Sequence, residues 1–110
     1  MIDQKTIATY FGNDASMLRK FVTVFIGESP SLVNQMDESL CSGDLNALAI
    51  HAHTMKGQLK YFGYPELVAK LEEIEQLADK KAAPALLSNL LSTFNREFED
   101  AYKALSAIVS

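Results

Sequence analysis

The sequence predicts an all-α protein, an antiparallel four-helix bundle with a short additional N-terminal helix. Three observations predict this fold. Apolar residues recur every three or four positions through almost the whole chain, which is the spacing of helices that bury one face. No segment alternates apolar and polar residues as a half-buried strand does. Capping residues, glycines and prolines divide the chain into a few helical segments with short connections, which favour antiparallel neighbours.

The first predicted helix is short. Asp3 is a suitable N-cap, and the helix runs to Phe11 before Gly12 ends it. Ile7 and either Tyr10 or Phe11 fall on its inner side.

A longer helix is expected to start at Asn13 or Asp14 and to reach Gly43. Pro30 interrupts it, but the apolar period resumes in phase after the proline. A kinked continuous helix is therefore predicted rather than two separate ones. Its expected inner side consists of Leu18, Phe21, Val22, Phe25, Leu32, Met36 and Leu40.

The third helix is predicted from Asp44 to Phe62, because Asp44 is a good N-cap and Gly63 is a good residue to follow a helix. His53 lies well away from its apolar side. That side is formed by Leu45, Leu48, Ala52, Met55, Leu59 and Phe62.

Two further helices follow. Pro65 and Glu66 suit a first turn, Lys80 and Lys81 suit the end of the same helix, and Pro84 opens the last one. The inner side of the first of these helices is Leu67, Leu71, Ile74 and Ala78, and that of the second is Leu87, Leu91, Phe94, Phe98, Ala101, Leu105 and Ile108.

Length and composition predict one domain over residues 1–110 and a cytoplasmic monomer. The chain has 48% hydrophobic and 22% charged residues, as globular domains do. A net charge of −4 without a basic stripe argues against nucleic-acid binding. Cys41 is the single cysteine, which excludes an internal disulfide and favours a reducing compartment. There is neither an apolar run of about 18 residues to cross a membrane nor a signal-peptide pattern.

The polar face of the third helix carries a group of residues suited to holding an anion. Ala49 lies one turn before His53, Lys56 and Gly57 lie one turn after it, and Lys60 lies two turns after it. Glycine inside a helix costs about 1 kcal/mol relative to alanine, so local stability does not explain Gly57. The missing side chain lets another protein or a phosphoryl group approach the imidazole.

These residues resemble the histidine-containing phosphotransfer (HPt) domain family, whose characteristic run is His-x-x-Lys-Gly with a second glycine six residues later. Here the run reads His53, Lys56, Gly57 and Gly63. The family usually has a small residue after the second glycine, where this chain has Tyr64. The resemblance extends to Phe25, Gly43, Asp44 and Ala52 upstream and to Leu67, Leu71, Ile74 and Glu75 downstream.

The resemblance implies a phosphorelay protein of two-component signal transduction. His53 would accept a phosphoryl group from the receiver-domain aspartate of a hybrid histidine kinase and pass it to the receiver of a response regulator. A neutral imidazole can act as the nucleophile, since an exposed histidine has a pKa of about 6.5. Lys56 and Lys60 would offset the added negative charge. Mg²⁺ is expected on the partner receiver domains, with no cofactor or metal on this chain.

The chain is predicted to be a phosphoryl carrier rather than an enzyme. It has no glycine-rich phosphate loop, no Walker-type lysine and no acidic cluster suited to Mg²⁺. Two other classes stay open: a helical docking module that binds a receiver or kinase without transfer, and the phosphoacceptor domain of a chemotaxis-type kinase. A purely structural bundle is the remaining alternative.

Other residues on these helices have competing interpretations. His51 stands about 200° around the helix from His53, so it is interpreted as a half-buried structural residue and not as a metal-chelating partner. Ile50 and Tyr61 flank His53 and could form a docking surface or pack against the preceding helix. The acidic group formed by Glu72, Glu73 and Glu75 is interpreted as a solvated helix face.

Overall fold

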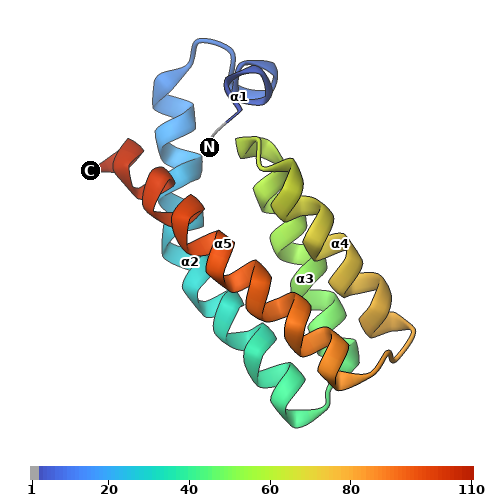
Figure 1. Ribbon diagram of the computed structural model, residues 1–110. Helices are drawn as coiled ribbons and strands as arrows, with labels where there is room; N and C mark the ends of the chain where they lie inside the picture. The colour runs from blue at the N-terminus through green and yellow to red at the C-terminus, as the bar shows by residue number, and fades with distance from the viewer. Residues whose placement is uncertain (1–2) are drawn as a thin grey trace.

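The computed structural model describes residues 3–110, and in this range every regular element is helical, as predicted (Figure 1). A single 3₁₀ turn, η1, separates the third and fourth α-helices. The elements are α1 (Gln4–Phe11), α2 (Ala15–Ser42), α3 (Leu45–Leu59), η1 (Lys60–Phe62), α4 (Pro65–Asp79) and α5 (Pro84–Val109).

The long helices α2, α3, α4 and α5 lie side by side, and the chain measures 44 × 22 × 19 Å (Figure 1). Helix α3 packs between α2 and α4, and α5 also contacts both α2 and α4. The short helix α1 lies at one end, where it contacts η1 and α2. This arrangement places α4 directly beside α3.

The predicted aspartate caps are present at three helix starts. The carboxylates of Asp3, Asp14 and Asp44 each accept a hydrogen bond from a backbone N–H two or three residues further along the chain. Such bonds satisfy amide groups that the first helical turn leaves without partners. Gly43 ends α2 in the left-handed conformation with φ of 76°.

The last turn of the third predicted helix is a 3₁₀ turn and not α-helical. The α-helical part of this helix ends at Leu59, and the predicted stretch as far as Phe62 is completed by the tighter turn η1. Gly63 follows with φ of 78°, as a residue that ends a helix in the left-handed region does. A Cβ atom on Gly63 would lie 2.5 Å from the Cβ of Asp3. Glycine is therefore required both by the backbone conformation and by the close approach of the N-terminal segment.

The core forms where the inner sides of the four long helices meet. All four predicted inner residues of α4 are buried, and in α5 only Ile108 is partly exposed. In α3 the buried side also includes Ala49. The residues that are fully enclosed include Val22, Met36, Leu48, Met55, Leu59, Leu71, Ile74, Leu87, Phe94 and Leu105.

One predicted core position needs correction, and one open choice is decided. Phe21 is 49% exposed, because the buried side of α2 passes instead through Val22, Phe25, Ser29 and Met36. In α1 the choice between two aromatic residues falls on Phe11, which is buried, and not on Tyr10.

Pro30 lies inside α2, and the helix continues through it as predicted. Proline has no N–H, so the carbonyl of Ile26 four residues earlier loses its usual helical donor. The hydroxyl of Tyr102 on α5 donates a hydrogen bond to this carbonyl at 3.3 Å. A side chain of a neighbouring helix thus supplies the donor that the proline lacks.

Candidate functional site

His53 lies on the outward face of α3, and 67% of its side chain is exposed. The helix holds the ring there because the opposite face of α3 supplies core residues, among them the fully buried Ala52 and Met55. The predicted exposure of this imidazole is therefore confirmed. His51 is half-buried, as expected for a residue on the other side of the helix.

A carboxylate from the neighbouring helix holds the imidazole. Glu75 on α4 places Oε2 3.0 Å from Nδ1 of His53. Its other oxygen, Oε1, accepts a hydrogen bond from Nζ of Lys56 at 2.9 Å. The expectation that Glu75 belongs to a solvated face is wrong, because only 21% of its side chain is exposed and both oxygens have partners on α3.

Glu75 is held in its ionised form. The hydrogen bond from Lys56 is the main reason that the pKa of this carboxyl lies below its usual value. Partial burial opposes this shift, while the Lys56 charge and the hydrogen bond with His53 add to it. An ionised carboxylate has no proton to donate. The contact between Glu75 and His53 therefore requires the proton to be on Nδ1, which leaves Nε2 of a neutral ring with a free lone pair.

Gly57 leaves open space one turn from the imidazole. A Cβ atom built on Gly57 would meet no heavy atom within 4 Å apart from its own helix backbone. The residue is therefore not needed for close packing within the chain. The role of Gly57 in admitting another molecule to the ring stays a prediction.

A shallow hollow of about 520 Å³ surrounds His53 and Glu75. Ala49 and Ile50 line it from α3, and Asp79 lines it from α4. Ile50 is 63% exposed, whereas Ala49 is only 5% exposed and contributes little surface. The apolar side chain available beside the ring on this side is therefore that of Ile50.

Lys60 and Tyr61 lie on the other side of Gly57, in η1. Nζ of Lys60 is 5.3 Å from the centre of the Tyr61 ring, so this ammonium group is directed toward the aromatic face and not toward Glu75. Tyr61 is half-buried and packs edge-on against Tyr10 of α1. Of the two lysines predicted at the site, the structure brings only Lys56 into direct contact with the His53–Glu75 pair.

An apolar hollow of about 330 Å³ adjoins Tyr61. Phe21 and Val24 of α2 line it and are 49% and 57% exposed. Sequence reasoning placed Phe21 in the core and therefore missed its contribution to this surface. Large exposed apolar side chains that gather into one patch are typical of a protein-binding surface.

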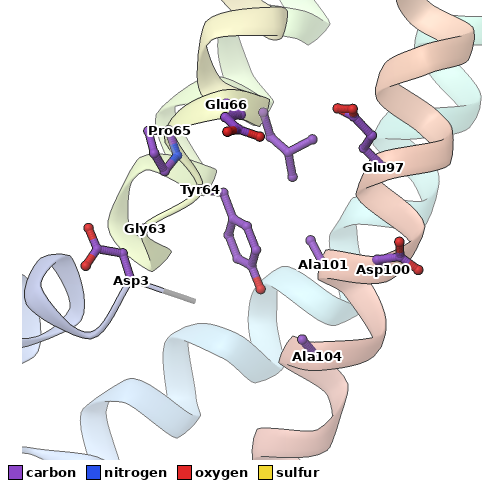
Figure 2. Close-up of a pocket in the computed structure, with 10 residues that line it drawn as sticks. Asp3, Gly63, Tyr64, Pro65, Glu66, Glu97, Asp100, Ala101 and Ala104 are labelled. Atoms are coloured by element: carbon purple, nitrogen blue, oxygen red, sulfur yellow. The ribbon is translucent and has the colours of Figure 1, made fainter. Parts of the chain in front are cut away.

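A separate cleft of about 660 Å³ lies between α5 and the start of α4 (Figure 2). It contains none of the predicted site residues. The Tyr64 ring forms part of its wall, and burial raises the pKa of its hydroxyl, which therefore stays protonated. The carboxylates on its wall are those of Asp3, Glu66, Glu97 and Asp100.

The described part of the chain offers no sign of a metal centre or of a membrane span. Among residues 3–110, no three His, Cys, Asp or Glu side chains form a group that could hold a metal ion. Over the same range, no helix has both the length and the apolar character needed to cross a bilayer.

Comparison with known families agrees with the geometry of the site. The family model of the Hpt domain matches residues 20–108, a span that includes His53, Lys56, Gly57 and Glu75. The chain belongs to the Hpt domain family. Hpt domains are helical phosphocarrier modules of two-component signalling, and they interact with receiver domains. No match was found among curated proteins or among solved structures.

Proposed function

We propose that this Hpt domain shuttles a phosphoryl group between the aspartates of two receiver domains, with His53 as the phosphoacceptor. One receiver would belong to a hybrid histidine kinase and the other to a response regulator. The observation that carries the proposal is the exposed His53 ring, whose Nδ1 is occupied by Glu75 and whose Nε2 is free. An imidazole held in this tautomer presents one nucleophilic nitrogen to solvent.

In the uptake step, the Nε2 lone pair attacks the phosphorus atom of an aspartyl phosphate. The P–O bond breaks and its electron pair leaves with the receiver carboxylate. The ring gains a P–Nε2 bond and a positive charge, while its proton stays on Nδ1 beside the Glu75 carboxylate. Glu75 therefore orients the ring before the reaction and offsets the ring charge after it.

Lys56 and Gly57 complete the site in this proposal. The ammonium group of Lys56 is 2.9 Å from Glu75 and lies one helical turn from His53, so it can also approach phosphate oxygens on the ring. Lys60 adds positive charge further along the same face. Gly57 gives the receiver close access. The Mg²⁺ ion belongs to the receiver domain in this mechanism, and the chain supplies no cofactor.

Receiver domains would dock on the outward faces of α2, α3 and η1. Ile50 stands on one side of His53, and Tyr61 stands on the other side, beyond Gly57. The exposed side chains of Phe21 and Val24 extend the apolar area next to Tyr61. Such a surface suits transient protein contacts that bury an apolar centre around the reacting groups.

The packing supports the finer description of the fold as a single antiparallel four-helix bundle over residues 1–110. Each of α2, α3, α4 and α5 packs along two of the others. We further propose that the chain acts as a monomer. We place it in the cytoplasm because receiver domains and their kinases present their phosphorylated aspartates there.

Histidine substitution tests the proposal directly. We expect His53→Gln to abolish labelling by a receiver domain carrying radioactive phosphate, because the amide has no nucleophilic nitrogen. His51→Gln is the matched control, since it changes the other histidine of the chain and should leave labelling intact. The product should be stable to base and labile to acid, as a phosphoramidate is.

Labelling of the His53→Gln protein at the wild-type rate would contradict the assignment. Docking of a receiver without any phosphate transfer would instead favour a binding module. Labelling by ATP and a kinase domain with no receiver present would favour the phosphoacceptor domain of a chemotaxis-type kinase.

A further inference from the structure

The contact between Glu75 and Nδ1 has a consequence for the release of the phosphoryl group. When the phosphoryl group leaves, the P–Nε2 bond breaks and its electron pair returns to Nε2. If Nδ1 carries a proton at that moment, the leaving group is a neutral imidazole. If Nδ1 has lost its proton, the leaving group is an imidazolate anion, which is a far stronger base and departs much more slowly.

A phosphorylated imidazole without a carboxylate neighbour loses its ring proton easily, because the positive ring then has no partner. In this structure the Glu75 carboxylate lies 3.0 Å from Nδ1, on the side of the ring away from Nε2. An ionised acceptor at hydrogen-bond distance favours the protonated ring. The same carboxylate oxygen can therefore accept a hydrogen bond from Nδ1 before, during and after uptake of the phosphoryl group.

The charged groups around Glu75 determine how strongly its carboxylate favours a proton on Nδ1 of His53. From α4, Glu75 and Asp79 face the hollow that holds His53, and from α3 the charged neighbour is Lys56. Neither α2 nor α5 contributes a residue to the lining of this hollow. Lys56 binds only Oε1, at 2.9 Å, and leaves Oε2 for the ring. The lysine thus orients the carboxylate toward His53 without taking the oxygen that His53 uses.

We propose that Glu75 keeps the Nδ1 proton on the phosphorylated His53 ring, so that transfer out of His53 releases a neutral imidazole. This inference rests on the proposed phosphoacceptor role of His53 and extends it to the donor step. The acceptor oxygen of an aspartate, or of water, forms the new P–O bond as the P–Nε2 bond breaks. The ring returns to the neutral Nδ1–H tautomer and needs no proton transfer of its own before the next uptake step. Where water is the acceptor, its proton stays on the phosphate product or passes to solvent.

The test uses phosphoramidate, a small phosphoryl donor that needs no receiver domain. All proteins carry His51→Gln, so that His53 is the one remaining histidine. Glu75→Gln keeps the size of the side chain and removes its charge. Glu73→Gln is the matched control, because Glu73 is an exposed acid about 200° around α4 from Glu75. Loss of the phosphoryl group to water is followed by phosphorus NMR between pH 5 and pH 9.

The rate of phosphoryl release should fall as the pH rises. We expect this fall to begin at a lower pH in the Glu75→Gln protein than in the parent. Above this pH the rate follows the fraction of protonated ring, so a displacement of one pH unit corresponds to about tenfold slower release at pH 8. The Glu73→Gln protein should match the parent. Nitrogen NMR should show the phosphorylated ring protonated at Nδ1 to a higher pH in the parent than in the Glu75→Gln protein.

Identical pH profiles for the parent and the Glu75→Gln protein would overturn the inference, as would an equal displacement in the Glu73→Gln protein. Failure of phosphoramidate to label His53, under conditions that label free imidazole, would also overturn it. If only the receiver experiment fails, the proposed shuttle between receivers is wrong but this inference is not. In that case the release of the phosphoryl group to water would still depend on Glu75.

Discussion

At the scale of single residues, the surroundings of His53 are formed by side chains from two helices. The ring belongs to α3 and Glu75 to α4, while Lys56 of α3 binds the second oxygen of the same carboxylate. The carboxylate is therefore shared between the His53 ring and the ammonium group next to it. Substitutions can test the effect of each side chain separately.

Gly57→Ala should stabilise the protein and slow phosphoryl transfer at the same time. Alanine favours a helix interior over glycine by about 1 kcal/mol, and the added methyl group meets nothing within 4 Å. The same methyl group would narrow the approach to His53. Gly27→Ala is the matched control, since Gly27 also lies inside a helix with open space around it. Urea unfolding and receiver labelling should show two stabilised proteins, of which only the Gly57→Ala protein transfers slowly.

Lys56→Ala should lower the free energy of unfolding by about 0.5–1 kcal/mol at pH 7. The pKa of Glu75 is lowered in the folded state, chiefly by Lys56. The stabilisation that ionised Glu75 gives the folded protein is therefore complete above the pKa of Glu75 in the unfolded state, near the ordinary value of 4.5. It is lost as the pH falls through the lowered pKa of Glu75 in the folded state.

Urea unfolding at pH 7 and at pH 3 measures this effect. The difference between wild type and the Lys56→Ala protein should shrink on acidification. Lys103→Ala removes an exposed pair at 3.6 Å and should change the free energy of unfolding little at either pH. A Lys56 effect that persists unchanged at pH 3 would show that the charge pair is not its cause.

The exposed position of His53 could be predicted from the sequence, but its carboxylate partner could not be assigned correctly. The spacing of His53, Lys56 and Gly57 places them on one face of one helix, which periodicity alone describes. The role of Glu75 depends on which helix lies beside that face and in what register. Within α4 alone, Glu75 resembles its exposed neighbours Glu72 and Glu73.

At the scale of single elements, the long helix α2 contains an interruption that another helix compensates. Pro30 leaves the carbonyl of Ile26 without a helical donor, and Tyr102 of α5 donates to it at 3.3 Å. The continuity of α2 could be predicted because the apolar period resumes in phase. The hydrogen bond from α5 could not, because it joins residues 76 positions apart.

Tyr102→Phe should lower the free energy of unfolding by about 1 kcal/mol, since the Ile26 carbonyl loses its donor. Pro30→Ala supplies a backbone N–H to the same carbonyl, so the tyrosine substitution should cost less in that background. Unfolding of the two single variants and the double variant gives the coupling energy. Equal costs in both backgrounds would show that the hydroxyl and the proline are not linked.

The core positions of α2 were predicted less accurately than those of α5, because the buried sides of the two helices differ in composition. In α5 the buried side consists of apolar residues throughout, and the periodicity identifies it directly. In α2 the buried side passes through Ser29 and Ser39, which a search for apolar residues overlooks. Phe21 is apolar but stands beside the buried side of α2, so its exposure could not be predicted from its hydropathy.

At the scale of the whole molecule, the N-terminal segment is joined to the end of the bundle next to the site. The backbone N–H of Asp3 donates to the carbonyl of Gly63 at 3.3 Å, and α1 packs against η1. Tyr10 of α1 contacts Tyr61, which lies on the proposed docking face. The position of α1 therefore affects the surface that a receiver domain would meet.

Gly63→Ala should destabilise the protein more than Gly43→Ala. Both glycines have a left-handed backbone, with φ of 78° and 76°. A Cβ atom on Gly43 meets nothing, whereas one on Gly63 lies 2.9 Å from the backbone nitrogen and oxygen of Asp3. The left-handed conformation alone costs about 1–2 kcal/mol in either protein. Urea unfolding measures the loss of unfolding free energy in each protein. A larger loss for Gly63→Ala than for Gly43→Ala reports the contact with the N-terminal segment, and equal losses would argue against that contact.

The side chains of His53, Lys56 and Glu75 all come from one helical hairpin, α3 and α4 with the turn between them. The proposed docking surface is divided between this hairpin, which carries Ile50 and Tyr61, and α2, which carries Phe21 and Val24. Substitutions on α2 would therefore alter part of the proposed docking surface while His53, Lys56 and Glu75 stay in place. Such modularity would let one hairpin serve pathways that must not cross-talk.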